Sequence, residues 1–531
     1  MEVALGWAGV EMQGARLDTP RRLRNLVRTC ENMFSNAGKS LSSALGDDVR
    51  QATYDLCSRT GRTPADLIAG HVAQTALRCT TASAAARVGR GVRRPAPILI
   101  IQDTVRLDYF THRGCKGLGP VGGEATSYGL FGHSALAVQA DGLPLGILAL
   151  DFWARDPAAH GSRNYRKSRN QEDKEPQIWL TTAKAVETAL QGTVAEHVPV
   201  LLVQDRGADL YQLFVQPRRE TTYILLRAYQ PRHAEVLAEP DAPYTAAEAC
   251  HECLETTPVD AAEPPALLTV ALLAAGSAPQ PAPSLYLPEI WPQAPVRIKE
   301  RLIEVSEQPA RPKTPAVPAR QARVEIRSAK VRIFRPVKCT ASECPSRHVD
   351  LWAVWVREPA PPEGVEPLHW MLLTTWPVDD AEAAGAVVDW YSRRWQIEML
   401  HRTLKSGLRV ESYQIDDAES LMNMLALAWV VAWRTLQLTH LARVSPEQPA
   451  ERCFSDDELS VLAARLGTRA TTLKEAVQQV ARFGGWPGHV RKQLPGVEVL
   501  WRGLRDLGVA ATVWEAAKRH FLRVARAHDT S

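Results

Sequence analysis

Two long apolar runs, each ending in Gln-Asp, constrain the fold of this chain more than any other feature. Residues 97–103 read Pro-Ile-Leu-Ile-Ile-Gln-Asp, and residues 197–205 read His-Val-Pro-Val-Leu-Leu-Val-Gln-Asp. An uninterrupted apolar run of this length is typical of a central strand that is buried on both faces of a sheet. Helical patterns at 177–191 and 209–214 flank the second run, so the sequence predicts an α/β fold.

Each run ends in a carboxylate, Asp103 in the first and Asp205 in the second. The carboxyl ends of central strands are where α/β sheets place their functional sites. Taken alone, either aspartate has a simpler interpretation as the N-cap of the following element. The repeated Gln-Asp ending weakens that interpretation, so both aspartates are candidate site residues.

A third carboxylate lies in residues 391–405, which contain neither glycine nor proline and carry leucines at helical spacing. The sequence therefore predicts one continuous helix. Its polar residues at steps of three and four are Tyr391, Arg394, Glu398, Arg402 and Lys405, and they share one face. The cations and the tyrosine hydroxyl suit a phosphate backbone, and the carboxylate suits a divalent cation. The simpler alternative is a solvated face with the ion pairs Arg394–Glu398 and Glu398–Arg402.

Asp103, Asp205 and Glu398 together predict a site for two divalent cations, Mg²⁺ or Mn²⁺. One ion would activate water or a 3′-hydroxyl, and the other would stabilise the leaving oxygen of an in-line displacement. The resulting hypothesis is metal-dependent chemistry on a phosphodiester.

The composition limits the number of domains, the compartment and the presence of a membrane span. The chain has 531 residues, of which 45% are hydrophobic, so several domains with a sizeable core are expected. A formal charge of +4 says little about nucleic acid by itself. Nine cysteines and no signal-peptide pattern after Met1 are typical of free thiols in a reducing cytosol. The most apolar run, 421–433, is shorter than the about 20 residues that span a bilayer, so a buried helix is expected.

Residues 1–95 are predicted to be helical and basic. Asp18-Thr19-Pro20 is typical of a helix start, with an N-cap residue before a proline. The arginines that follow are Arg21, Arg22, Arg24 and Arg28. They predict a cationic helix face for DNA phosphates or a minor groove, with an ordinary solvated face as the alternative.

Residues 230–365 differ in composition from the sequence on either side. Prolines are dense between 258 and 319, and residues 278–283 are of low complexity. Residues 323–335 alternate apolar and basic side chains, which predicts a hairpin with a basic face and a turn near Ser328-Ala329. The stretch is interpreted as an inserted, mainly β subdomain.

Cysteines in this stretch allow a second metal hypothesis. Cys250 and Cys253, together with Cys339 and Cys344, would supply four thiolates for zinc. The irregular second spacing and the separation of the two pairs along the chain favour free thiols.

The C-terminal part is predicted to be helical. An apolar helix is expected at 417–443, and further helices at 456–531 with a break at 484–488. The final helix, about 511–527, carries the apolar residues Trp514, Phe521, Leu522 and Val524. Such a stripe is a candidate dimer surface, with core packing as the alternative.

The polar residues of the predicted helix follow the pattern Tyr-x2-Arg-x3-Glu-x6-Lys, filled by Tyr391, Arg394, Glu398 and Lys405. The two aspartates lie in Ile-Gln-Asp-Thr (101–104) and Asp-Arg-Gly-Ala-Asp (205–209). With these motifs the chain resembles the DDE transposases of the insertion-sequence-four group, the hairpin-forming, cut-and-paste kind that includes the transposase of transposon five.

Further motifs extend the resemblance over nearly the whole chain. Trp395 follows the signature arginine, and Trp370 begins Trp-Met-Leu-Leu-Thr-Thr. Asp-Thr-Pro-Arg-Arg at 18–22, Gly-Lys-Ser at 38–40 and Ala-Arg-Phe-Gly-Gly at 481–485 are also similar. The Pro- and Ala-rich residues 258–320 and the short region before Asp18 depart from the family.

The resemblance implies an RNase-H-like mixed sheet core with an inserted β subdomain, flanked by N- and C-terminal helical domains. The implied boundaries are 1–95 for DNA binding, 96–229 and 368–440 for the catalytic core, 230–367 for the insertion, and 441–531 for dimerisation. It also implies a cytoplasmic, nucleoid-associated bacterial protein.

The resemblance assigns roles residue by residue. Asp103, Asp205 and Glu398 would be catalytic metal ligands for two Mg²⁺ or Mn²⁺ ions. Contacts to DNA would come from Tyr391, Arg394, Arg402, Lys405, Trp370, Trp395 and the N-terminal arginines Arg21, Arg22, Arg24 and Arg28. Trp370 would hold a flipped base, although a core aromatic is the simpler interpretation.

The implied activity is cut-and-paste transposition by a homodimer that pairs two transposon ends and joins them to target DNA. Nicking, hairpin formation, hairpin opening and strand transfer would use the same three carboxylates. The alternatives are a catalytically silent regulator that binds DNA ends and a structure-selective nuclease of the same fold.

Overall fold

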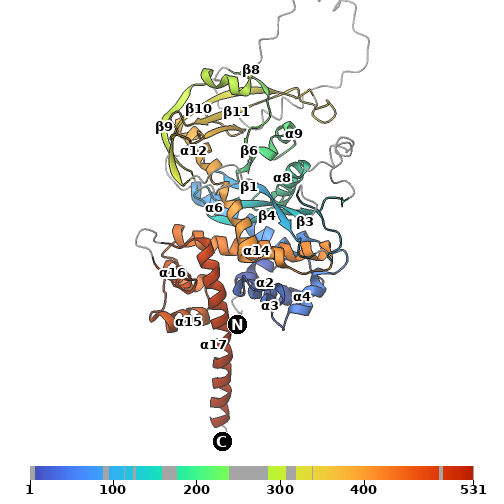
Figure 1. Ribbon diagram of the computed structural model, residues 1–531, viewed down its shortest axis with the longest axis vertical. Coiled ribbons are helices and arrows are strands. Elements are labelled where there is room, and N and C mark those ends of the chain that lie inside the picture. Colours follow the sequence, from blue (N-terminus) through green and yellow to red (C-terminus); the bar gives the residue numbers. More distant parts are fainter. Residues whose placement is uncertain are drawn as a thin grey trace, which may run out of the picture. The chain divides into compact units, whose positions relative to one another are not determined.

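The computed structural model describes residues 6–87, 95–112, 114–122, 127–157, 176–237, 285–305, 318–337, 339–488 and 494–529. The chain divides into two compact units, and Figure 1 shows their elements. The first unit comprises Met1–Val198 and Arg393–Ser531, and the second comprises Pro199–Ser392. Both units combine helices with strands, which confirms the predicted α/β class; the five domain boundaries stay a prediction.

Short helices open the first unit. They are α1 (Trp7–Met12), α2 (Pro20–Ser35), α3 (Leu41–Leu45), α4 (Arg50–Cys57), α5 (Pro64–Leu67) and α6 (Ala69–Arg87). Helix α2 begins where the sequence predicts, because the Thr19 hydroxyl accepts a hydrogen bond from the Arg22 backbone N–H and Pro20 fits the first turn.

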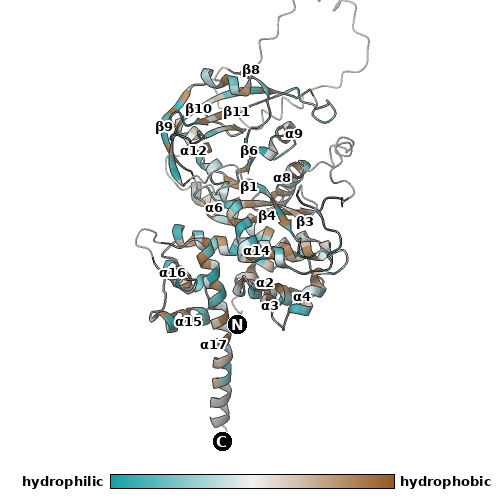
Figure 2. Ribbon diagram, viewed as in Figure 1, coloured by the Kyte–Doolittle hydropathy of each residue, from teal (hydrophilic) through white to brown (hydrophobic). Residues whose placement is uncertain are grey.

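The sheet of the first unit contains antiparallel strands. Helix α8 (Gln177–Leu190) follows these strands along the chain. The strands are β1 (Ile98–Asp108), β2 (Gly119–Pro120), β3 (Tyr128–Val138) and β4 (Pro144–Trp153). Strand β3 pairs with β1, β2 and β4. The apolar strands β3 and β4 are coloured as hydrophobic in Figure 2, and their residues form much of this core. The predicted strands and the helix at 177–191 are confirmed.

Asp103 lies in the middle of β1 and not at its end, so the predicted strand boundary is wrong. The strand continues through Thr104–Asp108 because these residues pair with Gly129–His133 of β3. Asp103 itself pairs with Ser134. A run of apolar residues thus marks only the most buried half of a longer strand.

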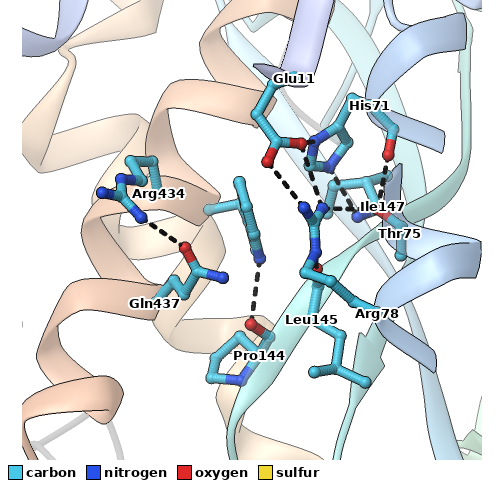
Figure 3. Close-up of polar contacts among 10 residues, drawn as sticks. Glu11, His71, Thr75, Arg78, Pro144, Leu145, Ile147, Arg434 and Gln437 are labelled. Atoms are coloured by element: carbon cyan, nitrogen blue, oxygen red, sulfur yellow. Dashed lines mark hydrogen bonds and ion pairs between the residues drawn. The ribbon is translucent and has the colours of Figure 1, made fainter. Parts of the chain in front are cut away.

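Side chains satisfy backbone groups of strand β4 that β3 does not reach. His71 Nε2 accepts from the Ile147 N–H at 2.9 Å, and the Arg78 guanidinium donates to the Leu145 carbonyl at 2.5 Å. Glu11 of α1 lies between His71 and Arg78, at 2.6 and 2.7 Å (Figure 3). We call Glu11, His71 and Arg78 the buried hub; it blocks strand addition at β4 and ties α1 and α6 to the sheet.

The prediction of one continuous helix over 391–405 is wrong, because the pattern of backbone hydrogen bonds changes within this stretch. Helix α12 (Ala381–Ser392) ends two residues before α13 (Trp395–Arg402) begins, and residues Thr403–Gly407 then form a π-helical turn. The backbone of Arg394 stays in the right-handed helical region, with an i→i+3 bond from Ile397 N–H to its carbonyl. The chain path is therefore nearly helical while the bonding pattern changes at both ends of α13.

Helix α14 (Ala418–Val444) begins at the Asp417 N-cap and forms the apolar centre of the first unit. It is long and apolar enough to span a membrane by composition, but nearly all of its residues are buried within the protein. The predicted buried helix is confirmed. A short 3-10 turn, Val410–Ser412, precedes it.

The C-terminal helices are α15 (Asp456–Leu466), α16 (Leu473–Phe483) and α17 (Val497–Asp529). The predicted break at 484–488 is confirmed, because α16 ends at Phe483. The last helix begins at Val497 and not near 511, so that boundary is wrong. The half of α17 nearest the C-terminus extends beyond the other helices of this unit (Figure 1).

The second unit is built on a mixed sheet in the order β5-β6-β12-β11-β10-β7-β8, with β9 against β10. Its strands are β5 (Val200–Gln204), β6 (Thr222–Arg227), β7 (His233–Val236), β8 (Leu285–Tyr286), β9 (Val296–Val305), β10 (Arg320–Phe334), β11 (His348–Arg357) and β12 (His369–Thr374). Helical segments of the second unit, besides α12, are Arg206–Ala208, α9 (Tyr211–Val215) and Leu287–Gln293. Only β5 and β6 pair in parallel among the registered pairs of its described strands. Strands from the predicted insertion therefore continue the sheet that contains β6 and β12.

The predicted hairpin at 323–335 is wrong, because β10 is one strand through Ser328-Ala329. The alternation of inward and outward side chains changes phase at Ser328-Ala329, where both residues are buried, and this imitates a turn in the sequence. The expected basic face is neutralised by the ion pairs Arg323–Glu300, Arg327–Glu325 and Arg332–Asp350.

Candidate active site

Asp103 and Glu398 converge on one guanidinium in the first unit. Arg394 Nη1 lies 3.5 Å from Asp103 Oδ2, and Arg394 Nη2 forms an ion pair with Glu398 Oε1. The side chains of Asp103, Arg394 and Glu398 are 17%, 22% and 56% exposed, so solvent reaches this cluster. The cluster combines strand β1 with the first turns of α13.

Two carboxylates that share one guanidinium are close enough to suit a hard divalent cation. A cation bound there would compete with Arg394 for both of them, because each carboxylate already has a positive partner. The donor set thus fits the predicted metal, although the described residues contain no group of three or more metal-ligating side chains.

The simpler ion-pair interpretation of this helix is confirmed for one pair and wrong for the other. Arg394 pairs with Glu398, whereas Arg402 pairs at 2.9 Å with Glu498 of α17. Arg402 therefore lies on the side of α13 that faces α17.

Lys405 projects from the π-helical turn and meets a carboxylate that sequence reasoning missed. Its Nζ lies 3.0 Å from Glu411 Oε1, and the same oxygen accepts the Asp108 backbone N–H at 2.9 Å. No sequence motif identifies Glu411, because it lies six residues after Lys405 in an irregular segment. Only the chain reversal at Arg409, whose φ is 52°, brings the two side chains together.

Buried histidines support the cluster from inside the first unit. Burial lowers the pKa of His401 on α13 to about 3, and the charges of nearby groups including Lys405 and Arg394 add to this effect. Burial also lowers the pKa of His133 on β3 to about 3, and its Nδ1 lies 2.7 Å from the Thr104 hydroxyl. Both imidazoles are therefore neutral near pH 7.

Asp205 belongs to the second unit and directly follows β5, as predicted. Its Oδ1 accepts the Gly207 N–H at 2.7 Å, so the N-cap interpretation is also correct for this residue. Asp209, from the same motif, is buried and paired with Arg232 at 2.5 Å, and it accepts the backbone N–H groups of Tyr229 and Gln230. Asp209 thus stabilises the fold of this loop.

Tyr391 and Trp370 pack against each other in the second unit. Their ring centroids lie 5.3 Å apart in an edge-to-face arrangement, with Tyr391 buried and Trp370 half-buried. Tyr391 is therefore part of the core, and a DNA contact by either ring stays a prediction. Trp395, which opens α13 in the first unit, is exposed beside His440.

Arginines gather beside Trp370. Arg227 donates to the His369 carbonyl at 2.8 Å. The pKa of His369 is lowered by partial burial and by the positive charges of Arg227, Arg357 and Arg206. The beginning of β12, at His369, thus lies in positive potential.

The N-terminal arginines differ in their partners. Arg22 pairs with Asp18, and Arg28 pairs with Asp48. Arg21 and Arg24 are exposed on α2, and no ion-pair partner for them occurs within the described part of the chain. These two arginines keep the cationic face that the sequence predicts.

The structure describes only two of the four cysteines in the zinc hypothesis. Cys339 and Cys344 are buried with their sulfur atoms 2.7 Å apart, whereas Cys250 and Cys253 lie outside the described residues. Free thiols are present at Cys339 and Cys344.

One family model matches the chain. Residues 430–521 match the model described as the Transposase Tn5 dimerisation domain. The matched part covers the second half of α14 and the helices α15, α16 and most of α17. The match supports kinship with Tn5-like transposases and the formation of a homodimer.

Proposed function

We propose that this protein is a DDE transposase of the hairpin-forming, cut-and-paste kind, with an RNase-H-like core. The observation that carries the proposal is the convergence of Asp103 and Glu398 on Arg394, in a chain whose C-terminal part matches a transposase dimerisation domain. Neither a binding module nor a structural protein needs two carboxylates within reach of solvent beside the signature cations.

In this proposal Asp103, Asp205 and Glu398 hold two Mg²⁺ or Mn²⁺ ions. When bound, such ions supply an activated water or 3′-hydroxyl and stabilise the leaving oxygen. Arg394 then moves from the carboxylates to a DNA phosphate group, whose two free oxygens offer it a bidentate anionic acceptor. Lys405 binds a second phosphate oxygen as a point charge.

The DNA path follows the remaining cations and rings. Arg402, Tyr391, Trp370 and Trp395 contact the cleaved end, and Trp370 stacks on a flipped base. Exposed Arg21 and Arg24, with Arg22 and Arg28, bind the DNA backbone farther from the cleavage point.

The reaction is a series of phosphoryl transfers. Water attacks one strand and releases a 3′-hydroxyl, which attacks the opposite strand and closes a hairpin. A second water opens the hairpin, and the two 3′-hydroxyls then attack target DNA. Each step either hydrolyses a phosphodiester bond to a 5′-phosphate and a 3′-hydroxyl or exchanges one phosphodiester bond for another with release of a hydroxyl, so the same carboxylates serve throughout.

The homodimer pairs two transposon ends through α17 in this proposal. Its exposed apolar residues are Val509, Val513, Trp514 and Phe521. The side chains of Leu522 and Val524 lie outside the described residues.

The decisive experiment uses DNA ends that flank the protein's own gene. The wild-type protein with Mg²⁺ or Mn²⁺ should nick these ends, form hairpins and join them to a target plasmid. Glu398→Gln should reduce nicking by a factor on the order of 1,000 while the gel-shift affinity for the ends is kept. Glu447→Gln, on an exposed loop, is the matched control and should nick normally.

Other outcomes select the alternatives. End binding without cleavage by the wild type would identify a silent DNA-end regulator. Cleavage without joining of 3′-hydroxyl ends would identify a structure-selective nuclease. Full cleavage by Glu398→Gln would exclude the assigned site.

A further inference from the structure

The π-helical turn places Lys405 against a fixed partner. Glu411 Oε1 lies 3.0 Å from Lys405 Nζ, and the same oxygen accepts the Asp108 N–H at 2.9 Å. Asp108 is the last residue of β1, the strand that carries Asp103. One carboxylate oxygen thus connects the lysine to the strand of the candidate active site.

The segment that presents Glu411 is tightly constrained. Thr403 and Leu408 close the π turn with an i→i+5 hydrogen bond at 2.9 Å, and Arg409 then adopts φ of 52°. Arg409 accepts from both the backbone N–H and the hydroxyl of Ser412, at 2.9 and 2.7 Å. A non-glycine residue in the left-handed region costs about 1–3 kcal/mol and persists only where its surroundings fix it.

The other carboxylate at the end of β1, that of Asp108, has hydrogen-bond partners of its own. The Asp108 carboxylate accepts from the Ser127 hydroxyl at 2.5 Å and from the Phe110 N–H at 3.0 Å. Buried Val410 and Tyr413 anchor the two sides of the Glu411 turn. The geometry therefore indicates that Glu411 orients the Lys405 side chain.

Exposure shows what this contact contributes. Lys405 and Glu411 are 33% and 31% exposed, so water screens the pair and its contribution to stability is small. An ammonium has three N–H donors, and a lysine held by one carboxylate oxygen still has donors for a phosphate. The pair is thus suited to aim the lysine and contributes little to the stability of the fold.

We infer that Glu411 is a positioning residue that holds the Lys405 ammonium in place for a DNA phosphate at the cleavage point. This inference rests on the proposed function, in which Lys405 binds that phosphate. Glu411 itself touches neither DNA nor metal. Its loss should leave DNA affinity intact and slow the chemical step, because a misplaced cation stabilises the transition state less well.

The test is a double-mutant cycle with single-turnover nicking of the flanking ends. Glu411→Ala should lower kcat for nicking by roughly tenfold while KM and the gel-shift affinity change less than about twofold. In a Lys405→Ala background, Glu411→Ala should have no further effect. Glu411→Gln should recover part of the rate, because its amide oxygen still accepts from both groups.

Controls separate positioning from folding. Asp456→Ala removes the carboxylate of a comparable surface pair, Asp456–Arg469 at 2.7 Å, and should leave nicking unchanged. If Glu411→Ala fails to fold, the cycle with Glu411→Gln replaces it and should show the same dependence on Lys405, with a smaller loss of rate.

The failures of the two proposals are distinguishable. Unchanged nicking by Glu411→Ala, or an equal loss of rate with and without Lys405, would overturn the positioning role while Glu398→Gln remains inactive. Absence of nicking by the wild type, or full nicking by Glu398→Gln and Lys405→Ala, would overturn the proposed function itself.

Discussion

The first unit contains two clusters of carboxylates and cations with different surroundings. In the buried hub, the side chains of Glu11 and His71 are 7% and 0% exposed, and Glu11 binds both His71 and Arg78. In the candidate active site, Arg394 binds Asp103 and the largely exposed Glu398. The residue types are similar, so only their surroundings distinguish the buried hub from the candidate active site.

The buried hub looks like a carboxylate–histidine catalytic pair until the second nitrogen is considered. His71 Nε2 accepts the Ile147 N–H, so this nitrogen is unprotonated and already occupied. Nδ1 therefore carries the proton and donates to Glu11. Because both nitrogens have fixed partners, His71 has no position from which to transfer a proton to a substrate.

The two clusters differ in whether other groups can replace the ion-pair partners of their side chains. Breaking the hub leaves the fully buried His71 without its acceptor and the Arg78 guanidinium, 23% exposed, without its carboxylate, which is strongly unfavourable. Breaking the Arg394 pairs exposes groups that water, a metal ion or a phosphate can satisfy.

The largest effect is expected from Glu11→Ala. Removing one partner of a buried ionic group costs about 3–5 kcal/mol, so the free energy of unfolding should fall by that amount. Glu398→Ala should change it by less than about 0.5 kcal/mol, because its partner is solvated. Urea denaturation monitored by circular dichroism measures both; equal losses would contradict the distinction between the clusters.

Acid should weaken the hub in a defined range of pH. Burial raises the pKa of Glu11, but the hydrogen bonds and charges of His71 and Arg78 outweigh it and lower this pKa from 4.5 to about 2. The folded-state pKa is below the unfolded one, so the stabilisation is complete above pH 4.5 and disappears as the pH falls through about 2.

The difference in unfolding free energy between wild type and Glu11→Gln measures this contribution. It should shrink by about 3 kcal/mol between pH 5 and pH 2. A difference that stays constant over this range would mean that Glu11 is not held ionised by its partners.

A smaller effect is expected for divalent cations at the active site. Arg394→Gln removes the cation that competes for Asp103 and Glu398, and each solvated pair is worth about 0.2–1 kcal/mol. The affinity of the DNA-free protein for Mn²⁺, measured by calorimetry, should therefore rise roughly twofold to fivefold. Arg402→Gln, whose partner is Glu498, is the matched control; weaker Mn²⁺ binding by Arg394→Gln would contradict the shared site.

The smallest effect separates paired from unpaired surface arginines. Replacing Arg21 and Arg24 by alanine should reduce the slope of log affinity against log salt for DNA ends by about 2, one for each phosphate contact. Arg323→Ala, which loses a cation already paired with Glu300, should leave the slope unchanged. Equal effects at the two places would show that α2 is an ordinary solvated helix.

Most strands and helices could be predicted because residue type and spacing over short stretches of the chain indicate them. The apolar runs of β1 and β5, the buried helix α14 and the start of α2 at Thr19 were all accessible from residue type and spacing. Boundaries were missed where pairing overrides composition. The polar half of β1 is a strand because β3 pairs with it, and β10 passes through Ser328-Ala329 because β9 and β11 pair with it.

The candidate site was predictable in part. The residue pattern alone selected the candidate site residues, because a motif of fixed spacing picks out Arg394, Glu398 and Lys405, and an apolar strand picks out Asp103. Only the tertiary structure decided their partners. Ion pairs depend on the positions of side chains that are distant in sequence, so the link between Glu411, Lys405 and Asp108 emerges only when the chain turns back at Arg409.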